Sequence, residues 1–466
     1  MGFQQGLSGL NGAAKALEAI GNNISNANTV GFKQSAPEFA DVFASSLASA
    51  GSSSQVGIGT TVSAITQEFS QGNITATSNP LDIAINGAGF FRMMDTTGAP
   101  SYSREGQFQV NKDGFLVNSA GLRLSGTMPA TGSTPVPIFI DTSNMAPRVT
   151  GGATPPVGLV MGLNLDSREA VPVNAMDNAL VPPAPKFAPG NAATYAIPSD
   201  PTTYNKSTSA TVYDSLGNAH QLGMYFVKGA STTFTDPITG VTSPAQTWQV
   251  YVNADNGTNT PEAANANGVD LMDPFIFTFN SSGKLVASTD MNGTATTTLG
   301  VIPVALTPGV TNPPVSTALP LSFNLNLAAT TQYGNIFGVN SITQDGFTSA
   351  QLSGLSVSAD GVVSGRYSNG QSKELAQITL TTFKNPNALV SLGGNQWAET
   401  GASGQPQIGN PGAGSNGVLQ ASAIEESNVD LTKQLVDMIT QQRTYQANAQ
   451  TIKTEDQILQ TLVSMR

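Results

Sequence analysis

The chain has 466 residues, none of them cysteine and only one of them histidine, His220. The absence of cysteine excludes thiol nucleophiles, iron–sulfur clusters and cysteine-type zinc sites. A single histidine excludes metal sites built on a histidine pair and permits at most one Ser-His-Asp constellation. Because His220 alternates along the chain with Leu222 and Met224, we interpret it as a strand residue beside a core rather than a catalytic base. The sequence therefore offers no metal site and no cofactor site.

Charge is also scarce. Charged residues make up 11% of the chain, with 30 acidic against 19 basic side chains and a formal net charge of −11. An acidic chain without a basic block is not expected to bind nucleic acid or an anionic membrane surface. Apolar runs stay well short of the roughly 18 residues that span a bilayer, so we predict no membrane insertion. The N-terminal residues also lack the pattern of an ordinary secretory signal peptide, so export would need another route.

Near both ends of the chain, apolar residues recur at alternating spacings of three and four, which is the pattern of a coiled-coil-like helix. The first pattern ends at the polar cluster SNANT, residues 25–29. Ser427 and Asp430 form an S-x-x-D pattern that predicts the start of the second helix. The seam positions are Leu7, Leu10, Ala14, Leu17, Gly21 and Ile24 in the first helix, and Leu431, Leu435, Met438, Gln442, Tyr445, Ala449, Ile452, Leu459 and Val463 in the second.

Between the ends, apolar and polar residues alternate, and turn pairs such as Asp360-Gly361 and Asn369-Gly370 recur. This pattern is typical of antiparallel strands joined by tight turns. Proline-rich stretches at 145–156 and 303–320 bracket a segment that we interpret as an insertion. The length suggests about three domains.

We therefore predict a multidomain chain in which paired, coiled-coil-like terminal helices flank antiparallel, sandwich- or barrel-like β domains. The predicted ranges are residues 1–25 and 429–466 for a helical core domain, 26–80 and 418–428 for an extended connector, 81–145 and 346–417 for an inner β domain, and 146–345 for an outer β domain.

The N-terminal stripe needs a packing partner. Full burial of its large aliphatic side chains would contribute on the order of 10 kcal/mol. Ordering about 20 backbone residues costs of the order of 1 to 2 kcal/mol per residue, and isolated helices are marginal in water. Two interpretations follow from periodicity. The helices are either an assembly interface that orders when subunits meet, or an ordinary helix pair that covers one end of a β domain.

Two further sequence features give little support for a binding or catalytic site. The string GAGSNG, residues 412–417, matches G-x-G-x-x-G but lies in a Pro/Gly loop without the strand and helix that a dinucleotide site requires. Carboxylates are sparse in the β region. The sequence alone also does not show whether any two of them lie at the distance that a glycosidase needs. A carbohydrate-active enzyme is left open and unsupported.

Several blocks of sequence resemble one known family. Residues Asn22–Lys33 (NNISNANTVGFK) resemble the N-terminal signature of the bacterial flagellar rod and hook axial proteins, and Ser427–Leu462 resembles the signature at the other end. Residues Ala210–Phe226 (ATVYDSLGNAHQLGMYF) are similar to the outer-domain motif of the hook-type members. The blocks Tyr102–Gly121 and Phe383–Thr400 also match. Finding both terminal signatures in register makes the resemblance specific.

The resemblance implies a structural protein and not an enzyme. The length and the inserted outer domain favour a hook-type subunit, which polymerises helically into a short, curved, hollow tube. Such a tube acts as a universal joint that transmits motor torque from rod to filament and encloses the export channel. A distal rod protein is the alternative within the family. A secreted β-rich binding protein is the alternative outside it.

The resemblance also implies partners and a location. The partners are further copies of this chain, the distal rod protein, the hook–filament junction protein, the hook cap protein during assembly and the flagellar type III export apparatus. The location is the extracellular hook outside the outer envelope, reached without a cleaved signal peptide. The residues expected at the assembly interface lie in the two helices and the two signatures: Leu7, Leu10, Leu17, Ile20, Ile24, Asn26, Asn28, Gly31, Phe32, Ser427, Asn428, Asp430, Leu431, Leu435, Met438, Tyr445, Ala449, Ile452 and Leu459.

Overall fold

A computed structural model describes residues 2–42, 59–129, 132, 134–153, 157–172, 176–177, 184–185, 201–235, 240–254, 274–290, 293–306, 319 and 321–465. The chain divides into two compact units. Unit 1 comprises Met1–Ser143 and Leu352–Arg466, and unit 2 comprises Asn144–Gln351. Each unit is described by itself.

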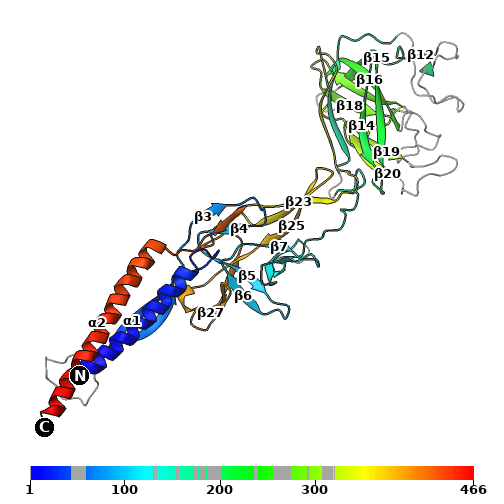
Figure 1. The fold of residues 1–466 in the computed structure, drawn as a ribbon. Helices are drawn as coiled ribbons and strands as arrows, with labels where there is room; N and C mark the ends of the chain where they lie inside the picture. The colour runs from blue at the N-terminus through cyan, green and yellow to red at the C-terminus, as the bar shows by residue number, and fades with distance from the viewer. Residues whose placement is uncertain are drawn as a thin grey trace. The chain divides into compact units, whose positions relative to one another are not determined.

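Unit 1 carries both terminal helices, α1 (Gly2–Ser25) and α2 (Leu431–Ser464), which lie side by side and antiparallel (Figure 1). Asp430 caps α2, because its side chain accepts hydrogen bonds from the backbone N–H groups of Thr432 and Lys433. The S-x-x-D pattern had Ser427 at the cap position, so the cap lies three residues later than that pattern predicts. Neither helix, nor any other among the described residues, is long and apolar enough to cross a membrane.

Strands β1 (Ser35–Val42) and β2 (Gly59–Gln67) form a two-stranded antiparallel sheet beside α1. A Cβ placed on Gly12 would lie 3.2 Å from the ring of Phe39, so the sheet packs directly on the helix. The backbone N–H of Thr60 donates to Ser8 Oγ at 3.3 Å. Within the range assigned to the extended connector, residues 26–80, these two strands therefore pair with each other and pack beside α1.

The β body of unit 1 is a 13-stranded sheet in which strands from two distant parts of the sequence pair. For example, β9 lies between β25 and β5, and β28 pairs with β6. Its strands are β5 (Phe90–Met94), β6 (Pro100–Ser103), β7 (Gln109–Val110), β8 (Leu116–Val117), β9 (Arg123–Thr127), β10 (Val136–Pro137), β23 (Leu352–Val357), β24 (Val362–Tyr367), β25 (Ser372–Ile378), β26 (Leu380–Thr382), β27 (Val390–Gly393), β28 (Gln396–Ala398) and β29 (Gln407–Gly409), with a 3-10 turn at η2 (Pro386–Ala388).

Two short strand pairs join the helices to this body. Strand β3 (Ile74–Ala76) pairs with β31 (Ala423–Glu425), and β4 (Ile83–Asn86) pairs with β30 (Val418–Ala421). The segment 418–428, which was assigned to the connector, contains both β30 and β31, and its residues Leu419 and Ala423 are buried. The chain therefore enters and leaves the helix pair through paired strands.

Unit 2 consists of two five-stranded sheets around one apolar core. One sheet has the order β14-β15-β16-β17-β18, and the other has the order β19-β20-β11-β21 with β22 also paired to β11. The strands are β11 (Leu159–Asp166), β14 (Lys206–Tyr213), β15 (Ala219–Thr235), β16 (Thr242–Ala254), β17 (Phe275–Asn280), β18 (Leu285–Thr289), β19 (Val301–Leu306), β20 (Leu321–Asn326), β21 (Thr331–Tyr333) and β22 (Gly338–Gln344), beside a separate pair β12 (Met176–Asp177) and β13 (Ala184–Pro185).

Purely antiparallel pairing was predicted for this region, and that prediction is wrong for β11. Strand β11 runs parallel to β20 and to β21. Parallel neighbours need a long crossover connection, and here the whole of the other sheet lies between β11 and β20 in the sequence. Alternation along each strand does not reveal this order.

Candidate functional site

The two terminal helices pair through small residues. In α1 the buried positions are glycine, alanine and one isoleucine, with Asn23 at the end of the row; they are Gly6, Gly12, Ala13, Ala16, Ala19, Ile20 and Asn23. A Cβ placed on Gly6 would lie 3.0 Å from Ile452 Cγ1, and one on Gly9 would lie 2.7 Å from Asn448 Nδ2. A side chain at either position would therefore require Ile452 or Asn448 to move aside.

Most of the large apolar residues of α1 face away from this contact. Phe3 and Leu7 are 47% and 43% exposed, and Leu10, Leu17 and Ile24 are partly exposed. The predicted heptad seam is therefore not the contact between the two helices. The heptad pattern marks the large apolar side chains of α1. The contact with α2 lies instead at Gly6 and Gly9, where the helix has no side chains.

Helix α2 also exposes large apolar residues. Among its described residues, only Gln434 is fully buried, while Leu431, Leu435, Val436 and Ile439 are exposed by 43% to 58%. Gly6 lies opposite Ile452 and α1 begins at Gly2, so the last turns of α2 extend beyond the start of α1 (Figure 1). That extension exposes Ile458, Leu459, Leu462 and Val463.

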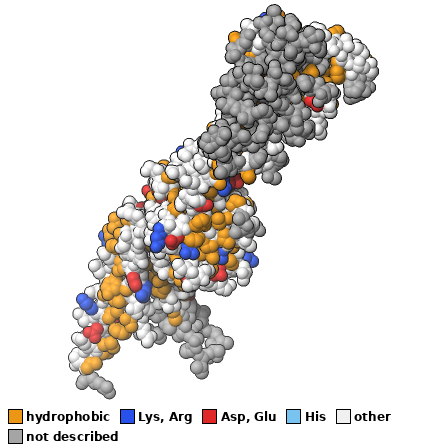
Figure 2. Space-filling model, turned by 90° about the vertical axis from the view of Figure 1, so that its right-hand side faces the viewer, with side chains coloured by type: hydrophobic (Ala, Val, Ile, Leu, Met, Phe, Trp, Pro, Cys, Tyr) orange, Lys and Arg blue, Asp and Glu red, His pale blue; other side chains and the backbone are white. Residues whose placement is uncertain are grey.

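Together these residues form the exposed helix face, which we define as Phe3, Leu7, Leu10, Leu17, Leu431, Leu435, Val436, Ile439, Ile458, Leu459, Leu462 and Val463. Figure 2 shows hydrophobic side chains gathered along the helical end of unit 1. Contiguous apolar surface of this kind is rare on monomeric proteins and marks sites of protein association. The face therefore has the chemistry of an interface that other molecules cover.

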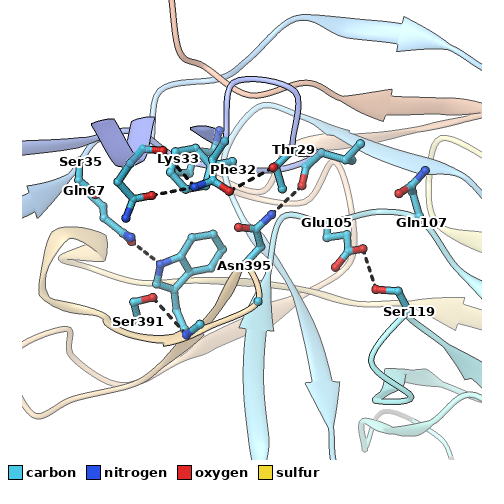
Figure 3. Close-up of a pocket in the computed structure, with 16 residues that line it drawn as sticks. Thr29, Phe32, Lys33, Ser35, Gln67, Glu105, Gln107, Ser119, Ser391 and Asn395 are labelled. Atoms are coloured by element: carbon cyan, nitrogen blue, oxygen red, sulfur yellow. Dashed lines mark hydrogen bonds between the residues drawn. The ribbon is translucent and has the colours of Figure 1, made fainter. Parts of the chain in front are cut away.

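The N-terminal signature lies at the junction between α1 and the β body. Its residues line a polar pocket of about 530 Å³ together with the β27–β28 turn (Figure 3). Asn395 Nδ2 donates to the carbonyl oxygen of Val30 at 2.8 Å, and Trp397 Nε1 donates to Gln67 Oε1. Burial raises the pKa of Glu105, although the hydroxyl of Ser119 donates to it and opposes that shift.

The C-terminal signature meets the N-terminal one at the same junction. Asn428 Oδ1 accepts from the backbone N–H of Gln34 at 2.8 Å, and Asn428 Nδ2 donates to the carbonyl oxygen of Glu68 at 2.8 Å. Asn23 Nδ2 donates to Gln434 Oε1 at 3.3 Å and also to the carbonyl oxygen of Ser35. The two signatures thus hold the bases of both helices together.

The predicted interface residues divide between these two places. Leu7, Leu10, Leu17, Leu431, Leu435 and Leu459 lie on the exposed helix face, and Ile24, Met438, Tyr445 and Ala449 are at least partly exposed elsewhere on the two helices. Asn26, Asn28, Gly31, Phe32, Ser427, Asn428 and Asp430 lie at the junction. Ile20 and Gly31 are buried within the subunit, and Ile452 packs on Gly6, so these three positions make contacts inside one subunit.

Three charged residues at the junction were not predicted. Lys33, Arg104 and Glu425 form a buried ionic cluster. Lys33 lies in a signature block, but its partner Glu425 is 392 positions away in the sequence. The only signal available from sequence was a charged residue within an otherwise neutral segment.

His220 and the glycine-rich string lie in a strand and in a loop, respectively. His220 lies on β15 with its Nε2 3.3 Å from Asp214 Oδ2, at the turn that joins β14 to β15. The string at 412–417 forms the loop between β29 and β30. In the described part of the chain, no group of three or more His, Asp or Glu side chains is placed to hold a metal ion.

Comparison with known proteins identifies the same regions. Four family descriptions match the chain: "Flagella basal body rod protein" at residues 3–33, "Flagellar hook protein FlgE/F/G D1 domain" at 84–150, "Flagellar basal body protein FlaE D2 domain" at 175–347, and "Flagellar basal body rod FlgEFG protein C-terminal" at 420–465. These matches include both helices and both signatures.

Full-length relatives are also found. The chain is 38% identical to the flagellar hook protein FlgE of Salmonella typhimurium and to that of Escherichia coli, and each match covers 100% of both chains. The hook protein of Treponema pallidum is 29% identical over 99% of this chain and 98% of its own. A crystal structure of the Helicobacter pylori hook protein FlgE2 has a TM-score of 0.49 at 15% identity, and covers 75% of this chain and 100% of that one. The full-length matches confirm the resemblance seen in the signatures: the chain belongs to the flagellar hook protein family.

Proposed function

We propose that the chain is the subunit of a flagellar hook and that it polymerises through the exposed helix face. The observation that carries this proposal is the division of each helix into two faces. Gly6 and Gly9 of α1 lie against Ile452 and Asn448 of α2, while leucine, valine and isoleucine side chains on the two helices are exposed. Because these side chains are already about half buried in the subunit, covering each one would contribute roughly half of the 1.5 to 3 kcal/mol that full burial of an exposed side chain contributes. A polymer of identical subunits supplies such a cover repeatedly.

In this proposal the paired helices form the inner layer of a hollow tube, in a coiled-coil-like arrangement between subunits, and the β units form its outer layers. The tube joins the rod to the filament, transmits torque and encloses the export channel. A hook is favoured over a distal rod protein, because the full-length relatives reported above are named hook proteins.

The proposed partners follow from that position. They are the distal rod protein at one end, the hook–filament junction protein at the other, the hook cap protein during growth and the type III export apparatus. The proposed location is outside the outer envelope, reached without a cleaved signal peptide. The low content of charged residues, 11%, means that few ion pairs need to be broken for the chain to travel unfolded.

Immunogold labelling of intact cells tests the proposal. An antibody raised against residues 146–345 is expected to place gold on a short curved segment between the cell envelope and the filament. Cells that lack the gene serve as the control. Gold spread over the cell surface or found in the medium would instead support a secreted β-rich binding protein.

A further inference from the structure

A buried ionic cluster ties the helix pair to the β body of unit 1. The side chains of Lys33 and Glu425 are 0% exposed and that of Arg104 is 4% exposed. Lys33 Nζ lies 2.7 Å from Glu425 Oε1, and Arg104 Nη1 lies 3.2 Å from Glu425 Oε2. One carboxylate is thus shared by two cations away from solvent.

The three residues come from three different parts of the chain. Lys33 follows α1, Glu425 ends β31 shortly before α2, and Arg104 follows β6 in the β body. The same carboxylate accepts a further hydrogen bond, from the backbone N–H of Gly72 at 2.9 Å. The cluster therefore joins the exit from α1, the entry to α2 and the body at a single point.

Each cation is also held by the backbone. Lys33 Nζ donates to the carbonyl oxygen of Ser70 at 2.6 Å, and Arg104 Nη2 donates to the carbonyl oxygen of Gly87 at 2.9 Å. Hydrogen bonds that involve a charged partner are directional and stronger than neutral ones. Contacts in several directions resist rotation of one part against another, whereas apolar packing is non-directional.

The backbone at Gly31 is fitted to the cluster. Gly31 has a φ of +71°, and its N–H donates to the carbonyl oxygen of Glu425 at 2.8 Å. A Cβ at this position would lie 2.7 Å from the carbonyl carbon of Arg104. A glycine is therefore required both by the left-handed conformation and by the close approach of the chain to Arg104.

The charges are not balanced within the cluster, which holds two cations and one anion. Burial lowers the pKa of Lys33 and that of Arg104, and the attraction of Glu425 offsets this only in part. Glu425 is thus the residue on which both cations depend. Removing the anion from a buried ion pair is strongly destabilising, because the cations stay buried without a counter-charge.

We propose that Lys33, Arg104 and Glu425 are the positioning residues that fix the direction of the helix pair on the β body. In the hook they transmit torque between the inner helical layer and the β layer around it. The torque role rests on the proposed function. The positioning of the helix pair on the β body concerns the single subunit and does not depend on that function.

Hydrogen exchange on the full-length monomer tests the structural part, with Glu425→Gln as the variant. The exchange of Gly31, Gln34 and Gly72 is expected to become at least about 100-fold faster, while strands β5 and β9 keep their protection. Glu426→Gln is the matched control, because Glu426 is the next residue and is exposed. The control is expected to exchange like the wild type.

Hooks assembled from the variant test the torque. A bead attached to a hook on a stalled motor reports torsional stiffness, which is expected to fall for Glu425→Gln and to stay normal for Glu426→Gln. Unchanged exchange and unchanged stiffness would overturn the inference. Faster exchange throughout the β body would also overturn it, because the cluster would then support the fold in general.

If Glu425→Gln does not fold, Lys33→Met decides the question. This variant leaves a balanced pair of Arg104 and Glu425, and it is expected to fold with faster exchange at Gly31 and Gln34 only. Unchanged exchange at both residues would overturn the inference. The wild-type chain could also fail to form a hook while the variant monomers show the expected exchange. That outcome would refute the proposed function but would support the structural role of the buried ionic cluster.

Discussion

Gly9 of α1 and Asn448 of α2 lie so close that a Cβ on the glycine would be 2.7 Å from Asn448 Nδ2. This contact explains why the heptad leucines of α1 point outward. The two helices approach at glycine positions of α1, and several large apolar residues of both helices stay exposed in the subunit.

Gly9→Leu is predicted to separate the helices in the monomer. Overpacking at a close contact costs about 1 to 3 kcal/mol, so the helical signal in circular dichroism should melt at a lower temperature. Gly21→Ala is the matched control, because no atom lies within 4 Å of a Cβ at Gly21 and alanine favours helix by up to about 1 kcal/mol. A Gly9→Leu variant as stable as wild type would show that the close contact is absent.

Leu435→Asp is predicted to abolish assembly without unfolding the subunit. Leu435 is 50% exposed in the monomer, so the carboxylate stays hydrated there and is desolvated only when another subunit covers it. Electron microscopy should show no tubes, while limited proteolysis should still leave a resistant β fragment. Gln446→Asp, at an exposed polar position on the same helix, is expected to assemble.

Leu10→Asp tests the other helix. Leu10 is partly exposed on α1, and the same loss of tubes with a folded β body is predicted. Normal tubes from both aspartate variants would contradict the role of the exposed helix face. Unfolding of the β body would show instead that these leucines stabilise the subunit itself.

Unit 2 is predicted to lose stability in acid through Asp345. Burial would raise the pKa of this carboxyl, but hydrogen bonds from the backbone N–H groups of Gly151, Ala153 and Val157 outweigh it and lower the pKa below its ordinary value of 3.8. A lowered folded-state pKa means that the stabilisation is complete above the ordinary value. It is lost as the pH falls through the lowered one.

Asp345→Ala leaves these backbone donors unpaired and is predicted to cost about 1 to 3 kcal/mol near neutral pH. Asp345→Asn keeps one acceptor and should remove the part of the acid dependence that Asp345 contributes. Fluorescence of Trp248, buried in the core of unit 2, reports this unfolding when measured in a Trp397→Phe background. Equal acid dependence in all variants would contradict the assignment.

The existence of the helices could be predicted from sequence, because spacings of three and four, the SNANT cluster and Asp430 are local signals. The contact face could not, because it depends on glycines that periodicity ignores. The outward position of Leu435 follows from that contact and not from the heptad pattern. Local pattern identifies the apolar residues of a helix, and tertiary packing decides which of them remain exposed.

The junction was predictable only in part. The signature blocks contain Gly31, Lys33 and Asn428, but Arg104 and Glu425, which complete the junction, come from distant parts of the sequence. The parallel pairing of β11 with β20 is equally non-local. Such features depend on which distant segments meet, and alternation along a single strand carries no information about that.

Thiol labelling at position 435 tests the central claim most directly, because the chain has no cysteine of its own and Leu435→Cys introduces a single thiol. In the monomer a maleimide should react quickly, since this side chain is half exposed. In isolated hooks the reaction should be at least about tenfold slower, and it should recover when the hooks are dissociated. Equal rates in monomer and hook would contradict assembly through the exposed helix face.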